Sequence, residues 1–587
     1  MPTLFLLLYN WFMEKKDYRH ETKIFQFLAL FLLFAALHAP RAACAELEAG
    51  EYASAVPPVE VKHDKAGDYV ADKPFPQWIR EETAASDGKL TGCSPGDGLI
   101  PEWARPLPVE PVRCAALNPK RNELWAATND GLVFLDLENK RKLYFAGRRW
   151  LPANDVFSVG VAPDGSAVAR TAKGDARIAR RMITLEQKAL YFENIVRIRH
   201  NREGMVSNSI LTTPGDLSSS RLTDDDNDGQ WTEMYLAAES FRYAATKDPE
   251  ALRNARESFK AMRRLLTATP VKGYVARSVL PASQCPGRDS QNWRTAPSGD
   301  YCWKTDTSKD ELIGHYFGLP IYYDLAADEA DRDSIRSLVR DLTDYLAGNG
   351  FRLLDETGKV TTYGNLDPEW INGPFGKMGD QGLNSTAALG MARSAFNITA
   401  DPKYLDLYKK FMDEHHYHIN ALKEKTISDR LQVNHDSDEM ASLSFYTLIN
   451  AERTDKKLRD DYFLEGMRRL WSTDLKERNA EQIIIYGAFE RNNFGLDLAV
   501  RTLREIPLDL VKWDVRNSHR RDVKISMKPD RFKTAQSIAV LPYTETRTMR
   551  WSDNMYRLDV SESANEEMVP TFWLLPYWMA RYYNLIR

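Results

Sequence analysis

The chain has 587 residues, of which 43% are hydrophobic and 28% are charged. That length and hydrophobic content suffice for one large domain and a smaller one, and they exclude a disordered or fibrous protein. The formal net charge is −4 with acidic and basic residues interspersed, so neither a nucleic acid nor a basic partner is indicated.

The first 45 residues have the pattern of a secretory signal peptide. A basic stretch precedes the apolar run 24–37, and an A-x-A cleavage pattern follows at residues 43–45. We therefore expect an exported protein, periplasmic or extracellular. It would meet a membrane only if this segment is uncleaved or is lipidated at Cys44. An additional apolar patch at the N-terminus leaves open whether Met1 or Met13 is the true start.

Cleavage after residue 45 would leave an even number of cysteines for an oxidising compartment: Cys93, Cys114, Cys285 and Cys302. We expect two disulfides. Four cysteines permit three connectivities, and the local pairs Cys93–Cys114 and Cys285–Cys302 are favoured because each brackets a loop rich in proline and glycine. The cysteine spacing has no metal-ligand signature.

Residues 46–106 are polar and proline-rich, and we interpret them as an export linker and an ordered coil. Residues 107–182 change to a period of two, in short runs bounded by turn sequences, which predicts a small β module. Within it, 123–145 and 151–175 resemble the repeat of regulator-type β-propellers, with a Leu-Trp strand, an Asp-Gly-Leu turn and a later Asn-Asp-Val. Too few blades are present to close a propeller, so we expect one β unit packed on the main domain.

Residues 183–587 predict helices throughout. In the segment 224–247 an acidic run stops at Gly229, and the helix behind it carries apolar side chains on every side, which is typical of a buried helix. The next segment, 249–267, keeps its apolar residues to one stripe, as an outer helix would. Further buried helices are expected to begin near residues 310, 379, 436, 480 and 564, separated by one-striped helices at 330–347, 402–424, 456–473 and 495–506.

Together with an amphipathic helix after Thr184, this order alternates six outer and six inner helices. The predicted fold is therefore mainly α, an (α/α)6 toroid preceded by the small β module. The spacing of the inner helices is too irregular for an array of equal repeats, although an open α-solenoid is the alternative.

Strict alternation would make all inner helices run the same way and gather their N-terminal ends at one mouth. Helix capping explains any single acid at these ends. It does not explain acidic clusters beside aromatic residues around one opening, a combination that suits sugars, because C–H faces stack on rings while hydroxyls bond to charged groups. The residues predicted to bind an oligo- or polysaccharide are Trp231, Tyr316, Trp370, Asp380, Asn384 and Tyr446.

The helix order over residues 184–587 resembles that of the (α/α)6-toroid carbohydrate-active proteins, which include glycoside hydrolases and polysaccharide lyases. The resemblance rests on helix order and the export signal, without a diagnostic motif. It implies an enzyme acting on glycans that requires no cofactor. Because a fold does not determine function, a non-catalytic glycan-binding protein is the competing hypothesis.

Glycoside hydrolysis needs two carboxyl groups, one protonated and one ionised. The pairs Asp310/Glu311 and Asp438/Glu439 lie at the starts of two different inner helices. We expect Glu311 to face Asp438 or Glu439 across the opening, and we favour a hydrolase because acids outnumber other candidates at the mouth.

A lyase acting on a uronic acid would instead need a His or Tyr base and a group that neutralises the carboxylate. His315 with Tyr316, and His435 with Asn434, lie at suitable positions for this alternative. Each histidine taken alone is more often a hydrogen-bonded structural residue.

The run Asp224-x-Asp226-x-Asp228-Gly229 matches the first half of a calcium-binding loop. The twelfth position, which should hold a bidentate glutamate, is Tyr235. A structural Ca²⁺ ion is therefore a hypothesis, and helix capping by Asp228 is the alternative. No nucleophile elbow and no glycine-rich phosphate-binding fingerprint occurs in the sequence.

Overall fold

The computed structural model describes residues 59–63, 67–81, 90–286, 292–377, 379–424 and 435–587. These residues belong to one compact unit, Tyr52–Arg587. The predicted signal peptide, the first part of the predicted linker, and Asn434 lie outside the described residues. Among the helices that are described, none combines the length and the hydropathy that crossing a membrane requires.

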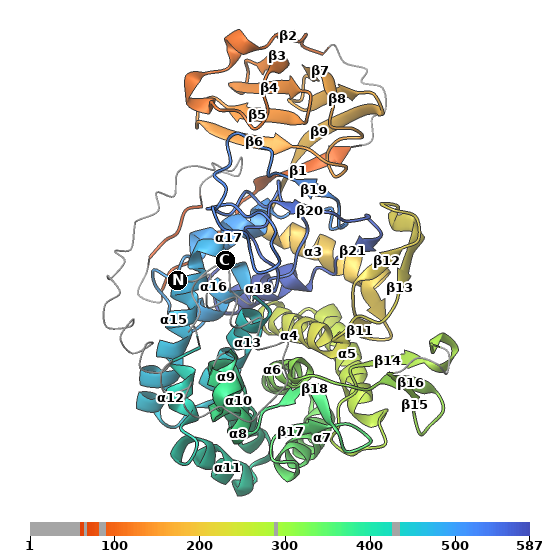
Figure 1. The fold of residues 1–587 in the computed structure, drawn as a ribbon, viewed down its shortest axis with the longest axis vertical. Coiled ribbons are helices and arrows are strands. Elements are labelled where there is room, and N and C mark those ends of the chain that lie inside the picture. The colour runs from red at the N-terminus through yellow and green to blue at the C-terminus, as the bar shows by residue number, and fades with distance from the viewer. Residues whose placement is uncertain (1–58, 64–66, 82–89, 287–291, 378, 425–434) are drawn as a thin grey trace, which may run out of the picture. The chain divides into compact units, whose positions relative to one another are not determined.

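The N-terminal β module consists of two antiparallel sheets (Figure 1). Their facing side chains form a compact aromatic core that includes Trp78, Trp125, Phe134 and Phe145. The propeller resemblance is not confirmed. One sheet has the order β2(Ser94–Pro95), β3(Val112–Asn118), β4(Glu123–Thr128), β5(Leu132–Asp136), β6(Arg141–Phe145), and the other β1(Phe75–Glu81), β9(Gly174–Ile183), β8(Ala167–Thr171), β7(Val156–Val161).

Residues 75–81 form strand β1, whereas residues 46–106 were predicted to form only linker and coil. It pairs with β9 over its whole length, from Phe75 opposite Ile183 to Glu81 opposite Arg177. Pro76 lies within this strand. Because β1 is at the edge of its sheet, a proline without an N–H donor is tolerated there.

The β module packs on a segment near the C-terminus. The Tyr144 backbone N–H donates to Glu545 Oε1 at 3.0 Å, and Arg149 Nη1 donates to the Thr546 carbonyl at 2.7 Å. Trp150 Nε1 donates to the Thr544 carbonyl at 3.0 Å. The segment 512–562 thus joins the β module to the helical part.

The helical part alternates between two kinds of helix, as predicted. In the first kind almost every residue is buried, and in the second only one face is. The buried helices are α4(Asp228–Thr246), α6(Lys309–Leu325), α10(Gln381–Thr399), α13(His435–Ala451), α16(Ala480–Gly487) and α18(Thr571–Tyr582). The one-faced helices are α3(Leu185–Ile195), α5(Pro249–Thr267), α7(Glu329–Gly348), α11(Pro402–Asp413), α15(Glu465–Asp474) and α17(Leu496–Glu505).

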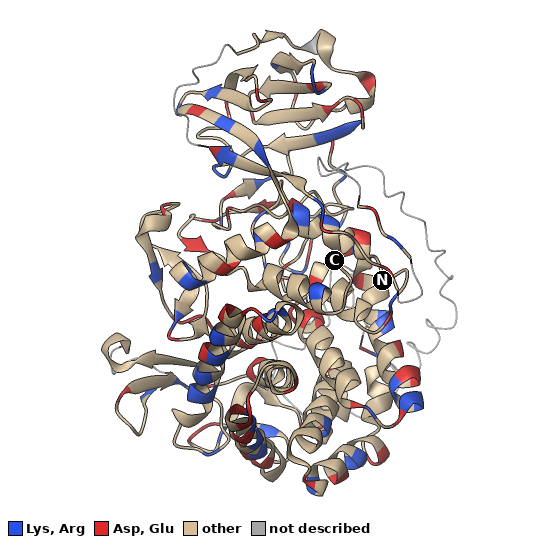
Figure 2. Cartoon of the chain, turned by 180° about the vertical axis from the view of Figure 1, so that it is seen from behind, with Lys and Arg blue, Asp and Glu red and all other residues tan. Residues whose placement is uncertain are grey.

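The difference in burial follows from the side chains that the helices carry. Figure 2 shows outer helices such as α5 and α7 banded with Lys, Arg, Asp and Glu, whereas the inner helices are mostly uncharged. The inner helices contact one another in chain order, α4 with α6, α6 with α10, and so on to α18. The last of them, α18, packs on the first, α4.

The last inner helix begins later than expected, at Thr571 instead of near residue 564. Glu566 and Glu567 form a short strand, β21, which pairs with β12(Ser209–Leu211). Pro570 then occupies the N-cap position. Glu566 and Glu567 are therefore extended backbone and not part of the helix expected from residue 564, because a distant strand supplies their hydrogen bonds.

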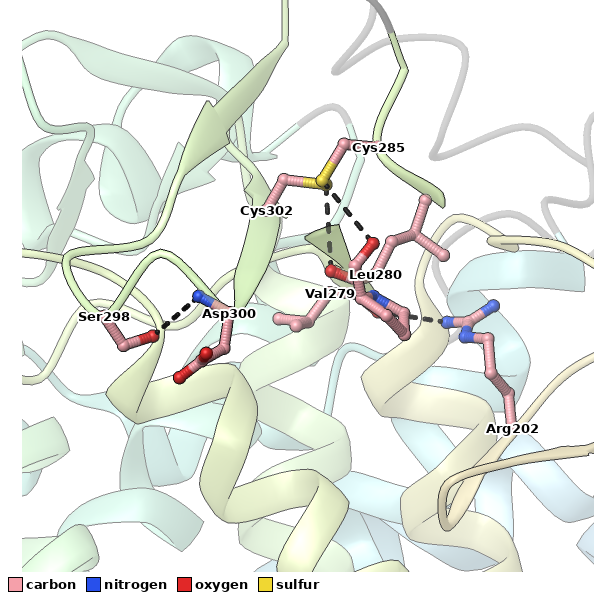
Figure 3. The surroundings of a disulfide bond; sticks show 8 residues. Arg202, Val279, Leu280, Cys285, Ser298, Asp300 and Cys302 are labelled. Atoms are coloured by element: carbon pink, nitrogen blue, oxygen red, sulfur yellow. Dashed lines mark hydrogen bonds between the residues drawn. A yellow bond between two sulfur atoms is a disulfide. The ribbon is translucent and has the colours of Figure 1, made fainter. Parts of the chain in front are cut away.

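Both predicted disulfides are present, Cys93–Cys114 and Cys285–Cys302. The first joins the residue just before β2 to β3 of the same sheet. The second lies in a three-stranded sheet of order β14(Ser278–Pro281), β16(Tyr301–Lys304), β15(Trp293–Thr295), which belongs to the insertion between α5 and α6 (Figure 3). The other short strands are β10(Asn201–Arg202), β11(Met205–Val206), β13(Ser220–Leu222), β17(Arg352–Leu354), β18(Val360–Asn365), β19(Val515–Arg516) and β20(Asp559–Val560).

Candidate functional site

The N-terminal ends of neighbouring inner helices are joined by polar contacts. Asn227 Nδ2, before α4, donates to Asp310 Oδ2 in the first turn of α6 at 3.2 Å. Lys309 Nζ reaches from α6 to Asp380 Oδ2, before α10, at 2.6 Å. Ser437 Oγ in α13 donates to Asp380 Oδ1 at 2.9 Å. The starts of these helices therefore gather at one place.

A cavity of about 450 Å³ opens beside the start of α13. One side is formed by the first turn of that helix, and the other by the segment 530–557, which has little regular structure. Its lining residues are His435, Asp436, Asp530, Arg531, Phe532, Thr534, Ser552, Asp553, Asn554 and Arg557. The cavity is therefore rich in polar and charged side chains, with one aromatic ring.

Two carboxyl groups from separate elements, Asp436 and Asp553, line this cavity. Partial burial raises the pKa of Asp436 above its ordinary value, and the negative charge of Asp553 raises it further, against the opposing effect of Arg531. Asp553 Oδ1 forms an ion pair with Arg547 Nη2 at 2.5 Å, and Asp553 Oδ2 accepts a hydrogen bond from the Arg550 backbone N–H at 3.1 Å. The two acids thus have different environments.

The imidazole of His435 also lines the cavity, and only 7% of the residue is exposed. Its Nε2 atom lies 3.2 Å from Glu477 Oε1, at the end of the helix before α16. A carboxylate behind an imidazole orients the ring. This histidine is thus positioned by a second element.

Lys309 links two of the predicted substrate-binding residues. Besides Asp380, it bonds Asn384 Oδ1 at 3.1 Å. Burial opposes ionisation of Asp380, but the Lys309 ammonium and the Ser437 hydroxyl outweigh that effect and hold its pKa below the ordinary value. Asp380 is therefore a charged link between α6, α10 and α13.

Asp310 and Glu311 are adjacent in sequence but differ in exposure. Burial raises the pKa of Asp310, although it remains partly exposed beside Asn227. Glu311 is fully buried, and its Oε1 accepts from the Gly229 backbone N–H at 3.2 Å. A Cβ atom at residue 229 would lie 1.8 Å from Glu311 Oε2, so the glycine makes room for this carboxyl between α4 and α6. Glu311 does not line the cavity.

The acids of α13 are also enclosed in the protein. Asp438 and Glu439 are buried, and neither is among the cavity residues. Burial raises the pKa of Glu439 to about 8, against the effect of Arg550. Burial also raises the pKa of Glu481 well above its usual range, and the neighbouring Glu439 adds to it. We expected Glu311 to face Asp438 or Glu439 across an opening, whereas the structure packs all three in the protein interior.

The predicted aromatic residues do not form a single lining. Trp231 lies under the Arg550 guanidinium, and Trp370 is 41% exposed on α8(Pro368–Asn372) close to the start of α10. Tyr316 is buried and bonds Thr343 on the outer helix α7 at 2.6 Å. Tyr446 lies about 16 Å along α13 from its first residue, at 1.5 Å per residue, and its hydroxyl contacts Tyr583 at 2.9 Å. Tyr316 and Tyr446 thus point away from the mouth.

His315 is placed in the interior. Its Nδ1 atom lies 2.8 Å from the Glu311 carbonyl one turn earlier, and the residue is fully buried. Burial lowers the pKa of His315 to about 4, which keeps the ring neutral at physiological pH. It contacts the helix backbone and does not reach the cavity.

The acids of the predicted calcium loop have cationic partners. Lys304 Nζ bonds Asp224 Oδ2 at 3.2 Å and Asp226 Oδ1 at 2.5 Å, and Arg202 Nη2 bonds Asp228 Oδ2 at 2.7 Å. Burial raises the pKa of Asp228 to about 6 despite Arg202. A calcium ion would have to displace Lys304. Among the described residues no group of three or more acidic, His or Cys side chains is arranged to hold a metal ion.

Sequence reasoning did not name the residues that the segment 512–562 contributes to the cavity: Asp530, Arg531, Phe532, Thr534, Ser552, Asp553, Asn554 and Arg557. This segment has no helical or strand periodicity, so no pattern indicates where its side chains point. The available signal is local, an exposed-loop sequence, Pro529 to Lys533, that places an arginine and a phenylalanine in a turn.

No protein-family model matches the sequence, and neither does any curated protein. Among solved structures the chain is similar to a sugar epimerase from a ruminal bacterium, with a TM-score of 0.40 and 10% identity over 68% of this chain and 97% of that chain. It is also similar to AaCel9A in complex with cellobiose-like isofagomine, with a TM-score of 0.38 and 11% identity over 79% and 97%. For the GH76A alpha-1,6-mannanase from Salegentibacter sp. HEL1_6 the TM-score is 0.27 at 11% identity over 68% and 98%. These similarities are too low to carry an argument.

Proposed function

We propose that this protein is an exported carbohydrate-active enzyme with an (α/α)6-toroid domain, and that it hydrolyses glycosidic bonds. The observation that carries the proposal is the pair of carboxyl groups, Asp436 and Asp553, in one cavity of about 450 Å³ at the start of an inner helix. The ordered contacts of the inner helices, closed by α18 on α4, support the toroid. The signal-peptide pattern and the two disulfides support export.

The two acids fit the two roles that hydrolysis requires. Asp436, whose pKa is raised by burial and by Asp553, is the general acid that protonates the departing glycosidic oxygen. Asp553, paired with Arg547, is the second carboxyl group, which activates water or attacks the sugar. Two carboxyl groups in different environments are the usual basis of such an assignment.

The acids predicted from the sequence take supporting roles in this proposal. Glu439 is buried in the same helix as Asp436 and interacts with Ser552, one of the lining residues. Glu311 is enclosed between α4 and α6. Asp310, which remains partly exposed, is the predicted catalytic acid that could still reach a bound sugar.

The experiment is a screen of the purified mature protein on a panel of neutral and acidic polysaccharides, read for new reducing ends. We expect reducing ends from at least one substrate, and none with the Asp436→Asn/Asp553→Asn double variant. Binding to glycans without any bond cleavage would instead indicate a non-catalytic glycan-binding protein.

A lyase is the second candidate, because His435 lines the same cavity and is backed by Glu477 at 3.2 Å. An imidazole held in this way can remove a proton from a sugar carbon. The same screen separates the two reactions, since elimination gives products that absorb in the ultraviolet and hydrolysis does not. Loss of that absorbance in His435→Ala, with Asp553→Asn still active, would establish the lyase.

A further inference from the structure

The loop that carries Arg531 and Phe532 is held in one conformation by Asp530. Its carboxylate accepts from the backbone N–H groups of Phe532 at 2.9 Å and Thr534 at 2.8 Å, and from Thr534 Oγ1 at 2.6 Å. Arg557 Nη2 bonds the same carboxylate at 3.2 Å. The carboxylate of Asp530 is thus occupied by hydrogen bonds that hold the turn. The next two side chains, Arg531 and Phe532, line the cavity.

The Phe532 ring is 62% exposed, an unusual state for a phenylalanine in a charged cavity. Two guanidinium groups flank it, with Arg531 Cζ at 4.7 Å and Arg557 Cζ at 5.6 Å from the ring centroid. An exposed ring of this kind offers a stacking surface for the apolar C–H face of a sugar.

The cations around the mouth are paired with acids, except for Arg531. Arg547 pairs with Asp553, Arg557 with Asp530, and Lys309 with Asp380. Within the part of the chain that the structure describes, no ion pair or hydrogen bond joins the Arg531 guanidinium to a carboxylate. Arg531 acts on Asp436 and Asp380 through its charge, without an ion pair or hydrogen bond to either among the described residues. Its guanidinium is therefore suited to bind a carboxylate of a ligand, in the bidentate geometry that arginine favours.

We propose that the substrate is an acidic glycan, in which the carboxylate of a uronic acid unit binds Arg531 while the ring of that unit stacks on Phe532. This inference rests on the proposed function, because it assigns a substrate class to the same cavity. Two of the acids that share the cavity are paired with cations: Arg547 pairs with Asp553, and Arg557 pairs with Asp530.

An anionic membrane is the other partner that a basic and apolar loop could meet, since Met527 and Lys533 are exposed on the same segment. The placement of Arg531 and Phe532 favours the glycan. Both side chains line a cavity of about 450 Å³, which a sugar unit enters and a lipid surface does not.

The test measures binding of the mature protein to three uronate polymers, polygalacturonate, alginate and glucuronan. Each is paired with its carboxyl-reduced form, which keeps the same linkage without the charge. We expect at least one acidic polymer to bind about tenfold or more tightly than its reduced form, with an affinity that falls as salt is raised. Equal affinity for both forms, or no binding of any acidic polymer, would overturn the proposal.

Three variants then locate the contact. Arg531→Gln should lower affinity for the acidic polymer about tenfold and leave the reduced polymer unchanged. Phe532→Ala should weaken both forms, since stacking does not depend on the carboxylate. Lys533→Gln is the matched control, because it removes the same charge from the same turn at a residue that does not line the cavity, and it should change either affinity less than twofold.

Failure of this inference and failure of the proposed function give different results. Selective binding through Arg531 without bond cleavage supports the acidic-glycan site and refutes the enzyme. Cleavage of neutral glycans that is unaffected by Arg531→Gln supports the enzyme and refutes the acidic substrate. Binding to vesicles containing anionic lipid, lost in Phe532→Ala and with no uronate binding, would assign the loop to a membrane.

Discussion

The Arg550 guanidinium lies over the indole ring of Trp231, 3.7 Å from its centroid. The same guanidinium pairs with Asp225, so one side chain of the segment 512–562 is attached to the start of α4 by its charge and by its flat face. Only 15% of the arginine side chain is exposed. This contact holds one wall of the cavity against the helical domain.

Removing the contact should loosen the wall. A largely desolvated cation over a tryptophan contributes about 1 to 2 kcal/mol, and the ion pair adds to it. We therefore expect Arg550→Ala to lower the free energy of unfolding by about 1 to 3 kcal/mol in urea titrations. The control is Arg516→Ala, an exposed arginine paired with Asp514, which should change stability by less than about 0.5 kcal/mol. Equal effects would contradict the assigned role.

Substituting either cavity acid should abolish turnover and leave the fold intact. Asp436→Asn and Asp553→Asn should each lower kcat/KM on the substrate found in the screen by about 10² to 10⁴-fold, the range of general acid–base catalysis. Asp460→Asn, an acid of the outer surface, is the control. A different result would assign the catalytic role to Glu311, the acid predicted from the sequence. In that result Asp436→Asn is fully active, and Glu311→Gln is inactive although its stability is unchanged.

The pH dependence of turnover should report Asp436. A general acid works only while protonated, so activity falls as pH rises through its pKa. Since burial and then Asp553 raise that pKa above 3.8, the fall should occur at higher pH than for an ordinary aspartate. Asp553→Asn removes one of the raising charges, and the residual activity of that variant should therefore fall at lower pH. An unchanged profile would show that the two acids do not interact.

Stability should depend on pH through Glu439. Its pKa is raised by burial from 4.5 to about 8 in the folded protein. Between these values the folded chain holds a proton that the unfolded chain has lost, so the contribution is complete below about pH 4.5 and declines as pH rises toward 8. One such proton changes the free energy of unfolding by at most about 1.4 kcal/mol per pH unit.

The Glu439→Gln variant has no ionisable proton at this position. Its free energy of unfolding should therefore decrease less than that of the wild type between pH 5 and pH 8 in urea titrations. Glu257→Gln, at an exposed position of α5, should keep the wild-type dependence. Parallel curves for the wild type and Glu439→Gln would show that Glu439 is not protonated in the folded protein.

The disulfide between Cys285 and Cys302 should stabilise the insertion before α6. It closes a loop with a sequence separation of 17, for which the chain-entropy model gives about 3 kcal/mol. We expect the Cys285→Ser/Cys302→Ser variant to be cleaved faster in this insertion by limited proteolysis, with Cys93→Ser/Cys114→Ser as the control. Peptide mapping of the unreduced mature protein checks the pairing itself, and free thiols at these positions would contradict it.

The sequence alone determined the helical alternation and the disulfide partners. The predicted starts of α4, α6, α13 and α16 agree with the structure to within a residue or so, because each helix shows its own burial in its pattern of apolar side chains. The pairs Cys93–Cys114 and Cys285–Cys302 were likewise local enough to infer from the chain.

Only the tertiary structure decided where the acids point and which of them share a cavity. Glu311 and Glu439 were predicted to lie at the mouth, but both are buried in the structure. Gly229 leaves the space between α4 and α6 that the Glu311 carboxyl occupies. Glu566 lies in a strand and not in the predicted helix, because it pairs with β12, which is more than three hundred residues away in the sequence. Arg531 and Asp553 come from a segment without periodicity, so their positions depend on contacts with distant parts of the chain, which no local pattern of side chains records.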